Sequence, residues 1–248
     1  MLFSPSLALV IPTLQEAATI ARAVREITLV LDSIGVSYEL IIVDDGSDDG
    51  TIEIVQGLRT SFSRLNLVQR VGERGLSGAV LAGWASTCAG VVGVIDADLQ
   101  HPPDVLIQLW KAMQAGNDLA IASRYLFGAE KGEWPWTRRM FSFIALCCCR
   151  PLLAESSVMD PLSGCFLIRG GIARSLPSLQ RSGFKLLLEI LVECPSLKIK
   201  ETPFVFGSRV KGKSKATLVV LQSYARLLIR LYWVRLGRRV IGKRADEK

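Results

Sequence analysis

Two carboxylates, a carboxamide and an imidazole follow one apolar run near the middle of the chain. The run spans residues 91–95 and leads into Asp96, Asp98, Gln100 and His101, followed by two prolines. A continuous run of valine and isoleucine is typical of a strand buried in a parallel sheet, and prolines end such a strand. Alternate residues of an extended chain share a face, so we expect Asp96, Asp98 and Gln100 to present oxygen atoms on one side. Such ligands suit Mg²⁺ or Mn²⁺, and a solvated polar strand end is the simpler alternative.

A second acidic group follows another apolar run, residues 38–43. Asp44 and Asp45 come directly after this run and open a loop with four carboxylates and two glycines. Ligands of open α/β sheets bind at the carboxyl ends of the strands, which is where this loop would lie. A helix cap at Ser47 or Asp48 would account for part of the loop. Two adjacent acids exceed what a cap needs, so we also expect a ligand-facing loop.

Apolar runs and helical segments alternate along the first half of the chain. The expected strands span residues 7–11, 38–43, 65–69, 91–95 and 118–122, and the expected helices span residues 17–31, 79–87 and 104–115 with a further helix from Thr51. Thr13 and Glu16 have the spacing of a capping box for the first helix. This alternation predicts an α/β fold with a Rossmann-like, mostly parallel sheet that carries helices on both faces.

The rhythm changes after residue 125. An apolar stretch, residues 140–153, follows two tryptophans and two arginines. It is too short to span a bilayer, and it fits either a helix at the membrane interface or a core helix with an arginine cap. A strand over residues 166–168, a helix over 183–194 and a strand over 197–206 are expected after it.

Basic residues gather at the C-terminal end. The net charge is +7, and the segment from Val205 carries twelve Lys or Arg against two acids, which gives +10 there and −3 for the preceding 204 residues. Residues 216–234 are apolar but contain Arg226 and Arg230, which share one helical face. We expect a basic amphipathic helix at a membrane surface, where further cations would face anionic headgroups: Arg235, Arg238, Arg239, Lys243 and Arg244. Nucleic acid is the weaker alternative, because no stacking aromatics are interleaved with the lysines.

The cysteines point to a reducing compartment. Six cysteines and one histidine show no spacing typical of zinc. Cys147, Cys148 and Cys149 are adjacent in an apolar run, so we expect three buried thiols. The first six residues lack the pattern of a signal peptide, and no window of 18 uncharged apolar residues predicts a spanning helix. We therefore expect a peripheral protein at the cytoplasmic face of a membrane.

Several strings of residues together resemble the family-2 inverting glycosyltransferases, and most closely the polyprenol-phosphate mannosyltransferases and glucosyltransferases. The strings are Ile11-Pro12-Thr13 with Glu16, residues 44–51, residues 96–103 and Ser123-Arg124-Tyr125, extended by Asp160 with Ser163-Gly164 and by residues 206–215. The resemblance implies a GT-A glycosyltransferase domain over residues 1–215 and a membrane-associating tail over residues 216–248. It also implies transfer of mannose or glucose, with inversion, from a nucleotide sugar (GDP-mannose or UDP-glucose) to polyprenyl phosphate, with Mg²⁺ or Mn²⁺ as cofactor.

The resemblance implies a role for each matched residue. The nucleoside would be held by Pro12, Glu16, Asp44 and Asp45, and the metal and the donor diphosphate by Asp96, Asp98 and Gln100. The anionic groups of donor and acceptor would be received by Arg124, Arg138, Arg209 and Lys215, and Asp160 would lie near the reacting sugar. The expected catalytic residues are Asp98, Arg124, Asp160 and Arg209. For each arginine, a surface salt bridge is the alternative.

Two other functions stay open from the sequence. Polyprenyl phosphate is already ionised at neutral pH, so positioning and charge stabilisation would carry most of the catalysis. A family-2 enzyme acting on a soluble sugar, a cell-wall component or a protein would need a dedicated general base. The second alternative is a nucleotide-binding protein without activity. Membrane attachment would be either stand-alone and peripheral or through a separate anchoring subunit.

Overall fold

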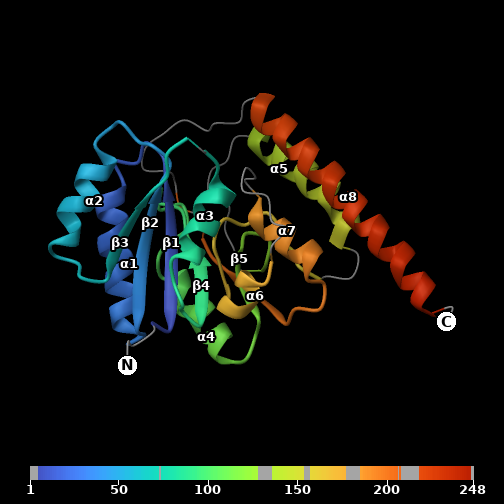
Figure 1. The fold of residues 1–248 in the computed structure, drawn as a ribbon, viewed down its shortest axis with the longest axis horizontal. Coiled ribbons are helices and arrows are strands. Elements are labelled where there is room, and N and C mark those ends of the chain that lie inside the picture. Colours follow the sequence, from blue (N-terminus) through green and yellow to red (C-terminus); the bar gives the residue numbers. More distant parts are fainter. Residues whose placement is uncertain are drawn as a thin grey trace.

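A single sheet carries the fold (Figure 1). The computed structural model describes residues 5–72, 74–127, 136–153, 157–176, 185–205, 207 and 218–246, with side chains described except at 137–139, 218–221 and 237–246. Within this part, seven strands pair in the order β3-β2-β1-β4-β6-β5-β7. Their bounds are β1 Leu7–Thr13, β2 Tyr38–Asp44, β3 Leu65–Gln69, β4 Val91–Val94, β5 Leu119–Ser123, β6 Phe166–Arg169 and β7 Ile199–Pro203. β6 runs antiparallel to both neighbours, and the other pairs are parallel.

Helices cover both faces of the sheet, as predicted. Their bounds are α1 Ile20–Ser33, α2 Thr51–Arg59, α3 Leu76–Ala85, α4 Val105–Gln114, α5 Trp136–Cys149, the 3₁₀ helix η1 Arg150–Leu153, α6 Gly170–Arg174, α7 Leu186–Glu193 and α8 Leu218–Asp246. Apolar side chains of α1, α2 and α4 join one core, and those of α3, α6, α7 and α8 join the core on the opposite face. The mostly parallel α/β fold is therefore confirmed.

The alternation of side chains explains why the central strands are apolar throughout. In β1, Leu7 and Leu9 belong to one core while Ala8 and Val10 belong to the other, and all four are fully buried. Both faces of a central strand are covered, so no position is left for a polar side chain. Complete burial of one such aliphatic side chain contributes about 1.5–3 kcal/mol.

The start of the first helix differs from the prediction. β1 continues through Pro12, which pairs with Val43 of β2 at a point beyond the residues that β4 pairs. Thr13 is therefore still in the strand, and its hydroxyl donates to Asp44 Oδ2 at 2.8 Å instead of capping a helix. The helix begins later, at Ile20. The expected capping box is wrong because Thr13 is part of strand β1 and its hydroxyl is bound to Asp44.

The expectation of three buried adjacent thiols is also wrong. Cys147 and Cys148 are exposed, and only Cys149 is buried. Successive residues of an α-helix point about 100° apart, so a helix packed on one side cannot bury three in a row. Burial raises the pKa of Cys149 to about 11, which leaves it a neutral thiol.

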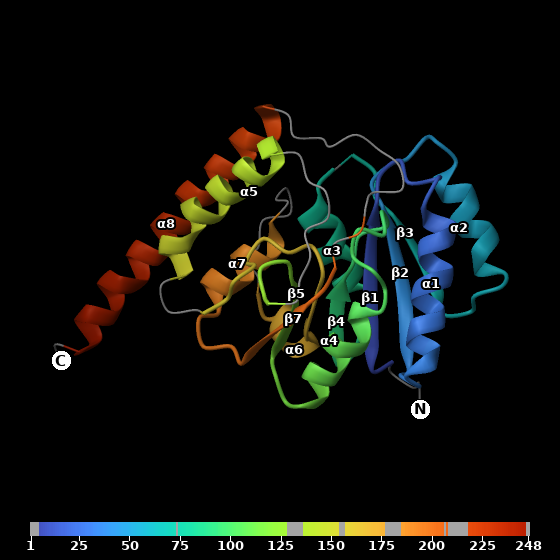
Figure 2. The ribbon, with the colours of Figure 1, turned by 180° about the vertical axis from the view of Figure 1, so that it is seen from behind.

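The C-terminal helix lies side by side with α5, as both ribbon views show (Figure 2). Tyr224, Leu227 and Leu231 of α8 are buried in the core. The Tyr224 hydroxyl donates to the carbonyl oxygen of Ala145 in α5 at 2.6 Å. Within the described part of the chain, no helix is long and apolar enough to cross a bilayer.

Two of the basic residues expected to face lipid bind the protein itself. The Arg230 guanidinium of α8 donates to the carboxylate of Glu189 in α7, which is fully buried. Arg235 donates to the carbonyl oxygen of Leu152. The expectation that Arg230 faces a membrane surface is therefore wrong, because the buried carboxylate of Glu189 needs an ion-pair partner. Arg226 is exposed, as expected.

The remaining cations of the expected basic face lie where no side chain is described. These are Arg238, Arg239, Lys243 and Arg244. The expected domain boundary between residues 215 and 216 also lies outside the described residues, and it stays a prediction.

Candidate active site

A pocket opens at the carboxyl edge of the parallel strands. Its volume is about 320 Å³, and its wall is formed by Pro12, Thr13, Leu14, Glu16, Asp45, Gly75, Leu76, Ala79, Asp96, Ala97 and Asp98. The wall comes from the ends of β1, β2 and β4 and from the start of α3. This edge is where open α/β sheets bind ligands, and a pocket of this size suits a small molecule. Four of the predicted donor-binding carboxylates, those of Glu16, Asp45, Asp96 and Asp98, meet here.

The two adjacent acids at the end of β2, Asp44 and Asp45, make different contacts. Asp44 is buried, and its carboxylate accepts hydrogen bonds from the backbone of Gly46 and Ser47 at 3.0 and 2.8 Å, and from the Ser47 hydroxyl at 2.6 Å. It shapes the loop. Asp45 faces the pocket, where its carboxylate accepts from Arg70 at 2.9 Å and from the Gly75 backbone at 2.8 Å. Of the pair, Asp45 is the one placed to meet a ligand.

Asp48 and Asp49 of the acidic loop form hydrogen bonds with the segment that follows β1. The Asp48 carboxylate accepts from the Gln15 side chain at 2.5 Å, and Asp49 accepts from the Ala17 backbone at 3.0 Å. Asp49 also accepts from the Thr51 backbone at 3.1 Å, next to the start of α2. The expected cap at Ser47 or Asp48 is wrong, because the residue that precedes α2 is Gly50 and no described side chain caps this helix. The acidic loop therefore anchors the segment after β1, and its Asp45 lines the pocket.

The acidic motif after β4 is a turn, not an extended strand. β4 ends at Val94, and Leu99 adopts a left-handed conformation with φ of 58°. The Asp98 carboxylate accepts from the Gln100 backbone at 3.0 Å, which closes the turn. Short aspartate side chains stabilise such turns by bonding the backbone two residues on. The expectation that alternate residues would share one face is therefore wrong.

This turn still brings two carboxylates to one pocket. Asp96 and Asp98 line it, the Asp96 side chain being 36% exposed, whereas Gln100 is buried away from the pocket wall. Within the described residues, no three His, Cys, Asp or Glu side chains converge as a complete metal site. Two carboxylates do fit Mg²⁺ or Mn²⁺, which often take their other ligands from water and substrate phosphates. The residues are therefore suited to a cation bound together with a diphosphate.

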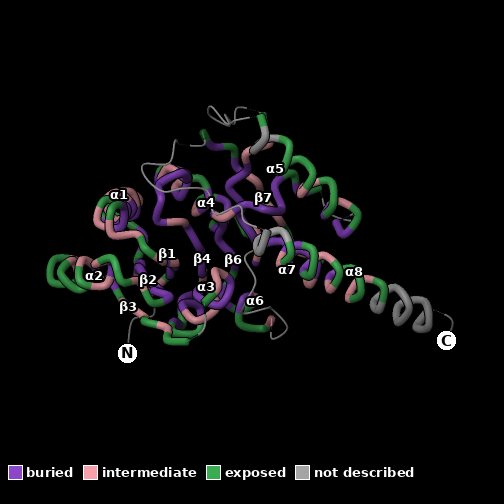
Figure 3. Tube along the Cα trace, turned by 90° about the horizontal axis from the view of Figure 1, so that it is seen from above, coloured by how far each residue is buried: buried purple, intermediate pink, exposed green. Residues whose placement is uncertain are grey.

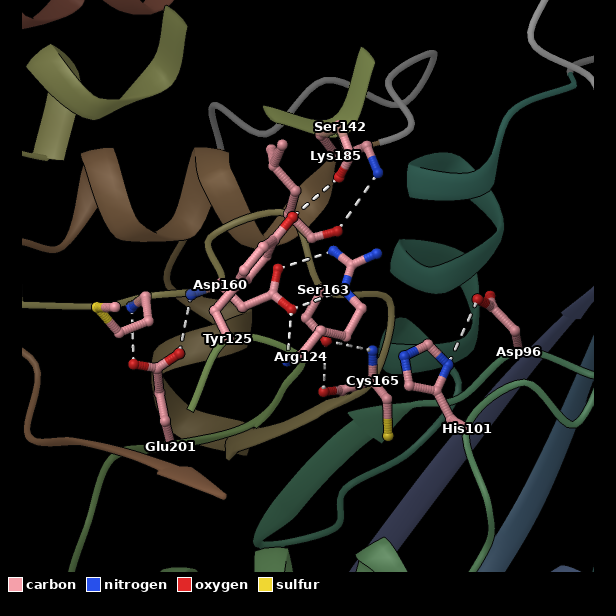
Figure 4. Close-up of polar contacts among 12 residues, drawn as sticks. Asp96, His101, Arg124, Tyr125, Ser142, Asp160, Ser163, Cys165, Lys185 and Glu201 are labelled. Carbon is pink, nitrogen blue, oxygen red and sulfur yellow. Dashed lines mark hydrogen bonds and ion pairs between the residues drawn. The ribbon is translucent and has the colours of Figure 1, made fainter. Parts of the chain in front are cut away.

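Arg124 and Asp160 form a buried ion pair beside the pocket (Figure 4). Arg124 follows β5, and its Nε and Nη2 donate to the two Asp160 oxygens at 2.7 and 2.8 Å. The Arg124 backbone donates to the same carboxylate at 3.0 Å. Asp160 is fully buried, and this ion pairing raises the pKa of Arg124 against the opposing effect of burial. The pair brings two of the predicted catalytic residues together, in a fixed bidentate geometry.

His101 lies near both the Arg124–Asp160 pair and Asp96 of the acidic motif. Its ring is buried and packs against Phe204 with centroids 4.9 Å apart. His101 Nδ1 lies 3.9 Å from Asp96 Oδ2. Burial and then the charge of Arg124 lower the pKa of His101 to about 4, so the ring is neutral at physiological pH. A Cβ on Gly164 would come within 2.8 Å of Asp96 Oδ2, so a larger residue there would displace the Asp96 carboxylate.

Two side chains that surround Asp160 were not predicted from the sequence to belong to the site. Glu201 of β7 accepts from the backbone of Met159 and Asp160 at 2.7 and 2.9 Å, one with each oxygen. Lys185 stands immediately before α7 and donates to the carbonyl oxygen of Leu162 at 3.3 Å. Lys185 is a single charge before an apolar run and Glu201 follows two lysines, and neither pattern identifies a partner.

Three predicted site residues cannot be placed. Arg209 and Lys215 lie outside the described residues, and Arg138 lies in α5 where its side chain is not described. Their expected contacts with anionic groups stay predictions.

Replacing Glu201 by glutamine is expected to lower kcat about tenfold. The glutamine offers one oxygen, and its amide group would face one of the two backbone donors, so one N–H loses a hydrogen bond to a charged group, worth about 1.5–3 kcal/mol. The loop that carries Asp160 would then be held less firmly. Steady-state kinetics of the sugar transfer that the sequence resemblance implies measures the effect. Lys200→Gln, at an exposed position of the same strand, is the control, and equal rates for both variants would contradict the role.

A comparison with known proteins agrees with this geometry. Residues 8–175 match the model of glycosyl transferase family 2. The chain belongs to this family. The GT-A-like fold is shown by a solved structure, glucosyl-3-phosphoglycerate synthase from Mycobacterium tuberculosis with Mn²⁺, uridine diphosphate and glucosyl-3-phosphoglycerate. The two structures superpose with a TM-score of 0.69 at 23% identity, over 94% of this chain and 80% of that one.

Curated relatives of this glycosyltransferase carry one recurrent name. The chain is 37% identical to the dolichol-phosphate mannosyltransferase of Pyrococcus furiosus over 223 residues, which cover 90% of this chain and 62% of that protein. It is 33% identical to the dolichol-phosphate mannosyltransferase of Mycosarcoma maydis over 94% of this chain and 81% of the relative. The chain thus spans less than two thirds of the length of the archaeal protein.

Proposed function

We propose that this glycosyltransferase transfers a hexose, mannose or glucose, from a nucleotide sugar to a polyprenyl phosphate, with inversion and with Mg²⁺ or Mn²⁺. One observation carries the proposal: the buried Arg124–Asp160 pair adjoins the acidic pocket, and the residue after Arg124 contacts α5, one of two helices with exposed apolar side chains. The names of the curated relatives support the same acceptor class.

The donor would lie in the pocket at the sheet edge. The nucleoside would rest against Pro12, Glu16 and Asp45, and the diphosphate near Asp96 and Asp98. A divalent cation bound by these two aspartates would neutralise the charge that develops on the diphosphate as the sugar leaves. Asp98 is held by its bond to the Gln100 backbone, so its carboxylate is oriented before the donor arrives.

The state of Asp160 favours an acceptor that is already ionised. Its carboxylate accepts three hydrogen bonds from Arg124, so it orients the arginine and is poorly placed to take a proton. A phosphate acceptor attacks with an oxygen that is charged at neutral pH and needs no strong base. A sugar or protein hydroxyl would need one. This observation ranks the soluble acceptor as the second candidate.

The apolar face of α5 and α8 supports a membrane as the source of the acceptor. It consists of Trp136, Met140, Phe141, Phe143, Ile144, Ile229, Tyr232, Trp233 and Leu236, each at least 36% exposed. Exposed positions run along both helices (Figure 3). Large exposed apolar patches mark interaction sites, and tryptophan and tyrosine favour the membrane interface. The Tyr125 hydroxyl lies 2.9 Å from Ser142 Oγ, which ties α5 to the residue after Arg124.

A product assay tests the proposed reaction. The full chain is incubated with Mg²⁺ or Mn²⁺, with labelled GDP-mannose or UDP-glucose, and with a short-chain polyprenyl phosphate. We expect an acid-labile, lipid-linked sugar from one donor, and none when the cation is chelated. Transfer to water-soluble acceptors alone would favour the second candidate. No transfer with either acceptor would overturn the proposal.

Charge placed on the apolar face is expected to release the protein from membranes. The double variant Phe143→Glu, Trp233→Glu should reduce cosedimentation with anionic phospholipid vesicles by at least tenfold. Each apolar side chain that is no longer buried in the membrane costs roughly 1.5–3 kcal/mol of binding free energy. Both side chains are exposed, at 63% and 70%, so the fold should persist. Val71→Glu, at an exposed residue remote from both helices, is the control. Vesicle binding that stays unchanged in the double variant would exclude this face as the membrane contact.

A further inference from the structure

Lys185 is a cation beside the reaction centre that the proposed mechanism does not yet use. It stands immediately before α7 and is only partly buried. Its ammonium donates to the Leu162 carbonyl oxygen at 3.3 Å, and Figure 4 shows it directed toward the loop that carries Asp160. The lysine therefore reaches the same edge of the sheet as the Arg124–Asp160 pair.

Two cationic side chains, Lys185 and Arg124, lie close enough to interact, an arrangement that suits a bound anion. Arg124 uses Nε and Nη2 to bind Asp160, so its positive charge is compensated by that carboxylate. Lys185 lies near enough to Arg124 for the two cations to repel each other. Burial and this repulsion both disfavour the charged lysine, and the attraction of Asp160 and Asp96 opposes them. A bound phosphate would relieve the repulsion and would receive charge-assisted hydrogen bonds.

The lowered pKa of Lys185 agrees with a cation that is close to another cation. Burial, followed by repulsion from Arg124, lowers it to about 8, while Asp160, Asp96 and Cys149 act in the opposite direction. These groups come from the ends of β5, β4 and α5 and from the loop before β6. An arriving phosphate would raise the pKa again and keep the lysine charged. Above pH 8 the free enzyme loses this charge, and phosphate binding should weaken.

The position of Lys185 separates the two substrates. The donor pocket is walled by the ends of β1, β2 and β4 and by α3. α7 lies instead between the sheet and the α5–α8 pair in both ribbon views. Lys185 directly precedes α7 and does not belong to the wall of the donor pocket.

We propose that Lys185 binds the phosphate group of the lipid acceptor and places it against the sugar carbon of the donor, an assignment that rests on the proposed function. The donor diphosphate carries the same chemistry, and kinetics distinguishes the two sources. The lysine orients the attacking phosphate oxygen while Arg124, held by Asp160, borders the other side of the acceptor.

Lys185→Ala and Lys185→Arg test the assignment, with Lys111→Ala at an exposed position of α4 as the matched control. Initial rates are measured with a short-chain polyprenyl phosphate varied at saturating donor, and with the donor varied at saturating acceptor. We expect Lys185→Ala to raise the acceptor KM about 10- to 100-fold, the worth of one hydrogen bond to a charged group. The donor KM should stay within about twofold. Lys185→Arg should recover most of the loss.

The pH profile gives a readout that a purely structural lysine would not move. In the wild-type enzyme the acceptor KM should rise above pH 8, and in Lys185→Arg it should stay flat over that range because arginine keeps its charge. A rise in donor KM instead would assign the lysine to the donor. Equal losses of activity and of Tm in Lys185→Ala and Lys185→Arg would make it a structural residue. Either result overturns the proposal.

Calorimetric binding of the same short-chain polyprenyl phosphate separates this assignment from the proposed reaction. If the wild-type protein binds the lipid phosphate but transfers no sugar, the reaction fails, and weaker binding by Lys185→Ala still supports the lysine. If the wild-type protein does not bind it, both fail. If all variants bind it equally, only the assignment of Lys185 fails.

Discussion

Replacing Asp98 by asparagine is expected to lower kcat/KM for sugar transfer roughly a thousandfold. Asp98 lines the pocket at the edge of the sheet, and the substitution removes a full negative charge where the proposed cation and diphosphate would bind. Lewis-acid stabilisation of a leaving diphosphate is worth several kcal/mol, and about 4 kcal/mol corresponds to a thousandfold. Asparagine keeps an oxygen that can accept from the Gln100 backbone, so the turn should persist.

The measurement combines steady-state rates with a cation titration. We expect the concentration of Mn²⁺ at half-maximal rate to rise at least tenfold in Asp98→Asn, because a carboxylate ligand has become neutral. Asp104→Asn removes an equal charge at an exposed position just before α4 and should leave both quantities unchanged. An Asp98→Asn enzyme with wild-type rates and an unchanged cation requirement would show that the metal and the diphosphate bind elsewhere.

Replacing Asp160 by asparagine is expected to cost both stability and activity. Asp160 is fully buried, and the substitution leaves the guanidinium of Arg124 without its counterion while placing an amide group against its donors. Breaking a buried ion pair from one side typically lowers the free energy of unfolding by about 3–5 kcal/mol. Transfer should fall at least a hundredfold, because Arg124 would lose the bidentate contact that orients it.

Urea denaturation measures the stability of Asp160→Asn, and a lower midpoint with an unchanged m-value identifies a loss of stability. The control is Glu26→Gln, which removes an exposed ion pair between Arg22 and Glu26 on α1. Exposed pairs of this kind contribute about 0.2–1 kcal/mol. Equal effects of the two substitutions would mean that the Asp160 pair is not buried in solution.

Apolar runs in the sequence were sufficient to predict the main architecture. The strands near residues 7, 38, 65, 91 and 119 were predicted to within about two residues of their observed ends, because a strand covered on both faces must be apolar throughout. Alternation with helices then required a mostly parallel sheet. The antiparallel β6, inserted between β4 and β5, depends on contacts distant in sequence that no local pattern encodes.

The sequence also predicted which residue types meet at the sheet edge, but not their individual contacts. Asp45, Asp96 and Asp98 line one pocket because strands of a parallel sheet end at the same edge. Asp44 shapes a loop instead, because its neighbours Gly46 and Ser47 turn back onto it. Such competition between nearby donors is decided by backbone conformation, which composition does not fix.

Pairings between distant charges were decided by tertiary structure alone. Arg230 shares a helical face with Arg226, and periodicity placed both toward lipid, yet Arg230 binds Glu189 of α7. No sequence pattern identified a partner for Glu201 or Lys185, and the fold brings both to the loop of Asp160. Local pattern determines which face of an element is buried, whereas the partner of a buried charge depends on how whole elements pack, because desolvation is compensated only by what the fold places within reach.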